Sequence, residues 1–244
     1  MQKITSITKE SLIKSFHDTL SDGFSSVGND ALGFNQRFPE SEQVIKMYSV
    51  AEFKNILELK LSKKRYIHSL NVADEARKLA EHYGYCDTDK AYLAGLLHDV
   101  CKEIPQEAQL EMVLKSDRSV SDAEKCTPAL FHAVAGAYYA ETVFGFTDED
   151  FLNSIRYHTV GRAGMSRLEE IVYIADLTSA ERDYKDVDKM RRYSRQSIEK
   201  AMLEALTFSI ESVMKKGSLI PVHTTEAYNF YRSALNEKNG KKTD

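Results

Sequence analysis

Apolar residues recur at helical spacing from Ala51 onward, in one segment after another. No stretch of the chain sustains the alternation of apolar and polar residues that is typical of strands. The pattern therefore predicts an all-α fold. We expect its helices within residues 52–84, 89–104, 106–114, 130–145, 148–159, 168–182, 197–216 and 224–235.

Residues that favour helix starts mark several of these boundaries. Ser62 is placed to break or cap the first segment. Ser166 followed by Glu169 forms a capping-box pattern before residues 168–182, and Thr147 followed by Asp150 resembles another. The boundaries support a series of separate helices.

The first fifty residues read differently from the rest. A short possible helix over residues 9–20 is followed by a stretch rich in Gly, Ser, Asn and Asp. We interpret residues 1–50 as an irregular N-terminal extension of unknown role, residues 51–235 as the main domain and residues 236–244 as a polar C-terminal tail. Removal of the extension is expected to leave the chemistry of the domain intact.

Net charge, cysteine content and hydropathy limit the binding partners and the cellular compartment that we expect. The formal net charge is -4 and the pI is about 6.0, so no overall cationic field favours nucleic acid as a partner. Three cysteines without a CxxC spacing suggest neither disulfides nor a zinc knuckle, and a reducing cytoplasm fits best. No segment offers the roughly 18 uninterrupted apolar residues of a membrane span, so we expect no membrane association.

Five predicted helices each carry a histidine or an aspartate beside apolar neighbours, where a polar side chain needs a partner. These residues are His68, His98, Asp99, His132, His158 and Asp176. Imidazole and carboxylate ligands together suit divalent iron, manganese, zinc or cobalt. Neighbours on a helix point about 100° apart, so His98 and Asp99 can reach one cavity.

Each of these residues taken alone is more often structural than functional, and only the ordered series H, HD, H, H, D favours a metal site. Three other histidines serve as controls. His82 follows His68 by fourteen residues, roughly 21 Å on a continuous helix, and cannot share its site. His17 and His223 lie in the extension and in a turn, and we exclude both as ligands.

The sequence at this point resembles the HD superfamily of phosphohydrolases. The doublet in LLHDVCKE gives that family its name, and the motifs KRYIHSLNVA, YHTVGRAGMSRLEEIVYIAD, ERDY and TTEAYNFY are similar to those of the YqeK-type symmetrical bis(5'-nucleosyl)-tetraphosphatases. The resemblance covers about residues 52–235, and the chain departs from the family pattern at Val160, Ala163 and residues 179–183.

The resemblance implies a helical bundle that holds two divalent metal ions, with iron favoured and manganese, cobalt or zinc as alternatives. It places His68, His98, Asp99 and Asp176 on one ion, and it lets Asp99 bridge to a second ion held by His132 and His158. It also implies symmetrical hydrolysis of diadenosine tetraphosphate to two nucleoside diphosphates by a hydroxide that the two metals activate.

Basic and polar residues near these ligands are candidates for binding the phosphates. Lys102 follows Asp99 by three residues, on the same face of a continuous helix, and we predict a catalytic role for both. A solvated lysine near a helix end is an equally good interpretation of Lys102. The predicted substrate contacts are Arg65, Lys102, Thr159, Gly161, Arg162 and Arg182, although a surface role is common for such arginines.

Three alternatives stay open. The chain is compatible with another HD nucleotidase or phosphodiesterase, with a non-catalytic module that binds a nucleotide, and with a purely structural metal site that leaves no position for water. The tyrosines Tyr157, Tyr173, Tyr184 and Tyr228 can stack on a base, yet most tyrosines at helical spacing are packing residues. A homodimer is a further possibility.

Overall fold

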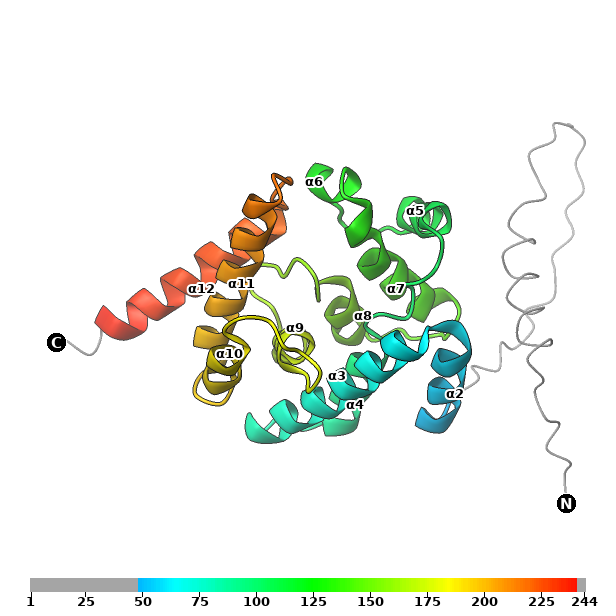
Figure 1. The fold of residues 1–244 in the computed structure, drawn as a ribbon, viewed down its shortest axis with the longest axis horizontal. Helices are drawn as coiled ribbons and strands as arrows, with labels where there is room; N and C mark the ends of the chain where they lie inside the picture. Colours follow the sequence, from blue (N-terminus) through cyan, green and yellow to red (C-terminus); the bar gives the residue numbers. More distant parts are fainter. Residues whose placement is uncertain (1–47, 241–244) are drawn as a thin grey trace, which may run out of the picture. The chain divides into compact units, whose positions relative to one another are not determined.

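The structure, a computed structural model, describes residues 48–240, and this part of the chain forms helices and turns without a strand. The prediction of an all-α fold is confirmed (Figure 1). The elements are α2 (Val50–Lys60), α3 (Lys63–His82), α4 (Thr88–Leu97), α5 (Gln106–Lys115), α6 (Asp122–Lys125), the 3-10 turn η1 (Pro128–Leu130), α7 (Phe131–Thr142), α8 (Glu149–Arg156), α9 (Arg167–Thr178), α10 (Val187–Ser194), α11 (Ile198–Lys215) and α12 (Val222–Gly240).

The structure describes little of the predicted N-terminal extension but most of the predicted C-terminal tail. Most of the predicted extension, with its possible helix over residues 9–20, lies outside the described residues. Helix α12 continues to Gly240, so the predicted tail from residue 236 begins inside a helix. The division into extension, domain and tail stays a prediction. None of the helices between residues 48 and 240 is long and apolar enough to cross a lipid bilayer.

Helices α3 and α4 pack side by side (Figure 1). Gly95 allows this close approach, because a Cβ atom at that position would lie 3.0 Å from the Cα atom of Ala73 and 3.0 Å from the carbonyl oxygen of Val72. Val72 and Ala73 are fully buried in the same contact. The packing brings His68 of α3 next to His98 at the end of α4.

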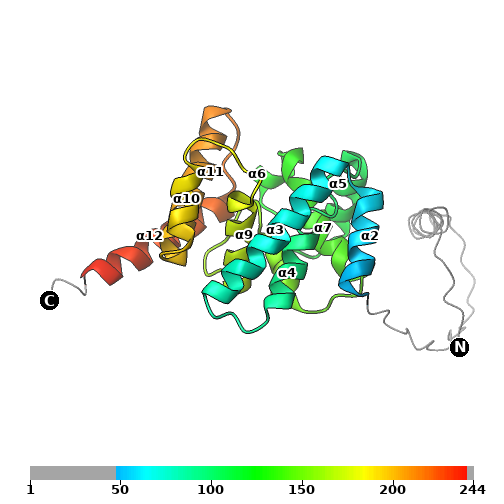
Figure 2. The ribbon, with the colours of Figure 1, turned by 60° about the horizontal axis from the view of Figure 1, so that its bottom comes forward.

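Helix α9 packs against α3, α4 and α8 and is buried along residues 168–175. Its apolar residues fill the core, and Asp176 lies near its C-terminal end. Helix α7 lies between α5 and α8. Helices α10, α11 and α12 group at one end of the bundle, beyond α9 (Figure 2).

Two of the predicted helix starts are confirmed and one is wrong. The hydroxyl of Ser62 accepts from the backbone N–H of Arg65 and caps α3. The hydroxyl of Ser166 caps α9. Helix α8, however, begins after Asp148 rather than Thr147, because the carboxylate of Asp148 accepts two backbone N–H groups of the first turn.

Four helices end three or more residues earlier than the sequence pattern predicts. Helix α4 ends at Leu97 instead of residue 104, α7 ends at Thr142 instead of residue 145, α8 ends at Arg156 instead of residue 159, and α9 ends at Thr178 instead of residue 182. The chain after α4 continues in tight turns, in which the backbone N–H of Lys102 donates to the carbonyl of Asp99 at 2.9 Å. The HD doublet and His158 therefore lie just past helix ends.

Candidate active site

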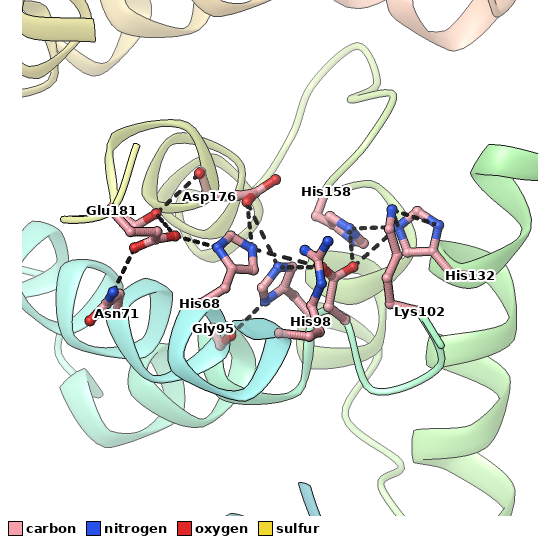
Figure 3. A network of polar contacts seen from close by, with 12 residues as sticks. His68, Asn71, Gly95, His98, Lys102, His132, His158, Asp176 and Glu181 are labelled. Atoms are coloured by element: carbon pink, nitrogen blue, oxygen red, sulfur yellow. Dashed lines mark hydrogen bonds and ion pairs between the residues drawn. The ribbon is translucent and has the colours of Figure 1, made fainter. Parts of the chain in front are cut away.

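Six side chains from separate parts of the fold meet in the interior (Figure 3). They are His68 on α3, His98 and Asp99 directly after α4, His132 on α7, His158 just after α8, and Asp176 on α9. Five of the six are buried, and the side chain of Asp176 is 19% exposed. All predicted metal ligands thus come together, although they are far apart in the sequence.

The carboxylate of Asp99 lies between two pairs of histidines. Its Oδ2 atom is 3.4 Å from Nε2 of His98 and 3.7 Å from Nε2 of His68. Its Oδ1 atom is 3.2 Å from Nε2 of His132 and 3.6 Å from Nε2 of His158. One carboxylate is therefore placed to serve two cations at once.

The aspartate of α9 completes the first of these groups. The Oδ1 atom of Asp176 lies 3.1 Å from Nε2 of His68 and 3.8 Å from Nε2 of His98. The potential ligand atoms of His68, His98 and Asp176 all lie within 4.8 Å of one another, and so do those of His98, Asp99 and His158. Atoms at such separations can surround an ion at the usual distance of about 2.0–2.2 Å.

Hydrogen bonds fix the orientation of all four imidazole rings. The Nδ1 atom of each ring faces an oxygen outside the cluster. The partners are the carbonyl of Gly95 for His98 (2.7 Å), the carbonyl of Ala129 for His132 (2.9 Å), the carbonyl of Ile155 for His158 (2.7 Å) and the carboxylate of Glu181 for His68. A ring that donates from Nδ1 keeps the lone pair of Nε2 free to face a metal.

Several of the inward-facing atoms lack a hydrogen bond. Nε2 of His68, Nε2 of His98 and Oδ1 of Asp99 are buried and have no hydrogen-bond partner among the described residues. Buried acceptors without a partner are uncommon and destabilising. A divalent cation would satisfy all three, and imidazole with carboxylate is a donor set that such ions prefer. The residues present therefore fit bound metal.

The pKa values of the cluster favour the ligand forms. Burial alone raises the pKa of the Asp99 carboxyl, but the surrounding imidazoles, His98 first, hold it well below its usual range. Burial lowers the pKa of His132 to about 4, although the neighbouring carboxylate of Asp99 opposes the shift. Near neutral pH Asp99 is thus ionised and His132 neutral, the protonation states that bind metal.

Three of the predicted phosphate contacts lie at the cluster. Arg65 donates from Nη1 to Oδ2 of Asp99 at 2.7 Å, and Nζ of Lys102 lies 3.1 Å from Nε2 of His132. Arg182 binds the carboxylate of Asp176 and also donates from Nε to its backbone carbonyl at 2.7 Å. The helix on which we expected Lys102 ends before it, yet the following turn still directs the lysine to the cluster.

The other predicted contacts lie on the loop between α8 and α9. The hydroxyl of Thr159 is buried without a hydrogen-bond partner among the described residues. Gly161 has a φ of 66°, which favours glycine, and a Cβ there would lie 3.3 Å from Leu206. Arg162 donates from Nε and Nη2 to the carboxylate of Glu169 at 2.8 and 2.6 Å. Only the remaining nitrogen of Arg162 is left to contact a phosphate.

Glu181 is the neighbour of the cluster that the sequence reasoning missed. Its carboxylate binds Nδ1 of His68 and accepts from the side-chain amide of Asn71 at 2.7 Å. Burial alone raises the pKa of Glu181, but its hydrogen bonds, the one with His68 first, together lower that pKa below its usual value. The only signal was its place in the ERDY motif beside Arg182, because no spacing in the sequence connects Glu181 with His68.

The three control histidines lie away from the cluster or outside the described residues. His82 sits at the far end of α3, which is continuous, and its Nε2 lies 2.9 Å from the carbonyl oxygen of Arg195. His223 binds the buried carboxylate of Glu124 at 2.9 Å. His17 falls outside the described residues. Among the tyrosines, Tyr173 is 1% exposed and packs in the core.

A polar cavity of about 780 Å³ lies beside the C-terminal end of α9. Asn71, Thr178, Ala180 and Arg191 form part of its wall. None of the six predicted ligands lines it, so this cavity is distinct from the histidine cluster.

Comparisons with known proteins agree with this geometry. The family model described as HD domain matches residues 65–181, which include all six predicted ligands. A protein of Bacillus subtilis (strain 168) named "Bis(5'-nucleosyl)-tetraphosphatase, symmetrical" is 34% identical over 170 residues, covering 70% of this chain and 90% of the relative. The chain belongs to the HD-domain family. Its branch of that family contains the symmetrical bis(5'-nucleosyl)-tetraphosphatases.

Two further matches support this placement. A Staphylococcus aureus (strain NCTC 8325 / PS 47) protein with the same name is 32% identical over 185 residues, covering 75% of this chain and 94% of the relative. A crystal structure from Clostridium acetobutylicum, described as a predicted HD superfamily hydrolase involved in NAD metabolism, superposes with a TM-score of 0.74 at 39% identity. It covers 77% of this chain and 99% of that chain. The resemblance seen in the sequence is confirmed.

Proposed function

We propose that this protein is a metal-dependent phosphohydrolase that cleaves diadenosine tetraphosphate and related dinucleoside polyphosphates symmetrically, to two nucleoside diphosphates. The observation that carries the proposal is the placement of Asp99 between two pairs of histidines, with Lys102 beside it. The names of the Bacillus and Staphylococcus relatives support the substrate. HD-domain proteins are metal-dependent, and the clusters described above are able to hold metal.

The distances support the division of ligands that the family resemblance implies. The group on the α3 side that would hold one ion comprises His68, His98, Asp99 and Asp176, and Asp99 would bridge to a second ion held by His132 and His158. Bound ions would supply a hydroxide nucleophile near neutral pH and draw negative charge from the phosphate under attack. Iron is our favoured metal by family resemblance, while manganese, cobalt and zinc suit the same ligands.

The chain's own basic groups would complete the reaction. The guanidinium groups of Arg65 and Arg182 bind the carboxylates of Asp99 and Asp176, and the ammonium of Lys102 lies beside His132. A tetraphosphate bound at the cluster would bring its own negative charge to these groups, which then neutralise it as the bond breaks. The hydroxyl of Thr159, the residue directly after His158, has no hydrogen-bond partner among the described residues and could donate to a phosphate oxygen.

A second candidate follows from the Clostridium structure, whose description names NAD metabolism. The same cluster would hydrolyse the pyrophosphate of a nicotinamide dinucleotide or the phosphate of a mononucleotide. A non-catalytic module that only binds nucleotides is the third alternative. The expected cytoplasmic location, the lack of nucleic-acid or membrane partners and a possible homodimer stay predictions.

A substrate panel separates these candidates. The purified protein, its metal content determined by elemental analysis, is offered diadenosine tetraphosphate, NAD, mononucleotides and a cyclic nucleotide. The proposal predicts that diadenosine tetraphosphate is hydrolysed fastest and that a chelator stops the reaction. Preferred hydrolysis of NAD or of a mononucleotide would overturn it in favour of the second candidate, and binding without hydrolysis would favour the third.

A further inference from the structure

The four imidazoles of the cluster obtain their outer hydrogen bonds in two ways. Those of His98, His132 and His158 use backbone carbonyls, each belonging to the residue three positions earlier. The last carbonyls of an α-helix and those before its first turn have no partner within the helix, so they are free to accept. His98 and His158 lie just past the ends of α4 and α8, and His132 is the second residue of α7.

The ring of His68 does not use such a carbonyl. It lies inside α3, which runs from Lys63 to His82. In a continuous helix each carbonyl accepts from the N–H four residues later, so the carbonyls preceding His68 already have a backbone partner. The acceptor for the ring of His68 comes instead from another part of the chain. Glu181, which is 113 residues away in the sequence, supplies it.

The carboxylate of Glu181 is itself held in place. One oxygen accepts from the amide of Asn71 at 2.7 Å, and the other accepts from the hydroxyl of Ser179 at 2.9 Å. Asn71 lies on α3 one turn beyond His68, so the helix that carries the ligand also positions the group that orients it. The side chain of Glu181 remains 32% exposed, and its replacement therefore leaves the core intact.

The loop that carries Glu181 is anchored from behind by α10. Arg191 donates to the carbonyls of Thr178 at 3.2 Å, Ser179 at 2.9 Å and Arg182 at 3.0 Å. These carbonyls lie on both sides of Glu181 in the sequence. One arginine thus fixes the segment that contacts His68 through Glu181 and Asp176 through Arg182.

We propose that Glu181 is a positioning residue that orients His68 and strengthens it as a ligand for the ion on the Asp176 side of the cluster. Its hydrogen bond keeps the proton on Nδ1 and the lone pair on Nε2, which faces Asp176. Glu181 also brings a negative charge that the carbonyls behind the other three rings lack. Because Glu181 binds the ring of His68 while the other three rings use carbonyls, its effect should fall on the ion that His68 would hold.

The inference rests on the metal role given under the proposed function, but it needs no assumption about the substrate. The test compares Glu181→Ala and Glu181→Gln with the unaltered protein. Glu81→Gln is the matched control, since Glu81 is an exposed glutamate of α3 and lies away from the histidine cluster, near the C-terminal end of that helix. Each protein is loaded with Mn²⁺ and dialysed against graded concentrations of a chelator, and elemental analysis gives the ions retained per chain.

We expect two steps of metal loss in the unaltered protein. In Glu181→Ala one step should move to a roughly 10- to 100-fold lower chelator concentration while the other stays in place. Glu181→Gln, which can still accept the Nδ1–H, should shift less than Glu181→Ala, and Glu81→Gln should not shift. An unchanged Glu181→Ala, an equal shift of both steps, or a Gln variant no better than the Ala variant would overturn the inference.

The outcome is independent of the hydrolytic assay. If diadenosine tetraphosphate is not a substrate and Glu181→Ala still loses one ion selectively, the proposed function fails and the inference stands. If diadenosine tetraphosphate is cleaved and Glu181→Ala retains both ions as the unaltered protein does, the inference fails and the proposed function stands.

Discussion

The Oδ1 atom of Asp99 lies 3.2 Å from Nε2 of His132, on a carboxylate whose other oxygen faces His98 at 3.4 Å. The two oxygens of one buried side chain therefore belong to different halves of the histidine cluster. An aspartate that joins two metal positions cannot be replaced by a group with one ligand atom. Asp99 is the residue on which the proposed site depends most.

Replacement of Asp99 by alanine should abolish both metal content and hydrolysis. The variant removes the bridging carboxylate but leaves the surrounding helices, so far-UV circular dichroism should still report a helical protein. Elemental analysis and an assay with diadenosine tetraphosphate check the prediction. Full activity in Asp99→Ala would refute the site as we describe it.

Replacement of Lys102 by methionine should leave the metal in place and slow the reaction. The ammonium lies 3.1 Å from Nε2 of His132, so its loss removes a positive charge beside the phosphate under attack. Loss of one such group typically lowers kcat by about 100- to 1000-fold. Lys185→Met, which changes an exposed lysine in the loop before α10, is the control. An unchanged kcat in Lys102→Met would show that this lysine is only structural.

Replacement of Arg162 by alanine should mainly destabilise the fold. Arg162 makes two hydrogen bonds to Glu169, which is 1% exposed and would lose its ion-pair partner. Because the arginine side chain is 32% exposed, we expect a loss of only about 1–2 kcal/mol in the free energy of unfolding. Urea denaturation measures it, with Arg192→Ala as an exposed-arginine control. Unchanged stability with a raised KM would instead assign Arg162 to the substrate.

The buried carboxylate of Glu124 should make the free energy of unfolding fall at acid pH. Burial raises its pKa, but the hydrogen bond from His223 and the charge of Arg156 more than compensate, and the pKa falls from 4.5 to about 2. Since the folded value is the lower one, the ionised carboxylate stabilises the fold above about pH 4.5, and this contribution is lost as the pH falls toward 2.

Urea unfolding between pH 6 and pH 3 tests this account of Glu124. The free energy of unfolding of the unaltered protein should fall more steeply over that range than that of Glu124→Gln, which has no carboxyl to protonate at this position. Parallel pH profiles for the two proteins would contradict the prediction.

Much of the fold follows from local patterns in the sequence, but some helix ends do not. Hydrophobic periodicity predicts the helices because each buries one face in the bundle. It fails after Leu97, where no glycine or proline interrupts the chain before Pro105 and the apolar pattern continues through turns. The early end of α4 matters because it leaves the carbonyl of Gly95 free to accept from His98 and orient its ring.

Part of the candidate site was likewise predictable from local sequence patterns, and part of it was not. The six predicted ligands come together because each projects from a helix or its end toward the core, as their apolar neighbours predict. Contacts between distant polar residues have no local signature. Glu181 reaches His68 across 113 residues, and Arg162 takes the carboxylate of Glu169 that a capping box would have used. Only the tertiary structure shows these partners.

The most direct test of the central claim is the identity of the products formed from diadenosine tetraphosphate by the metal-loaded protein, measured by chromatography of the nucleotides. Symmetrical hydrolysis predicts ADP as the only nucleotide product, and no product from Asp99→Ala. Formation of AMP together with ATP, or the absence of hydrolysis by the metal-loaded protein, would contradict the account.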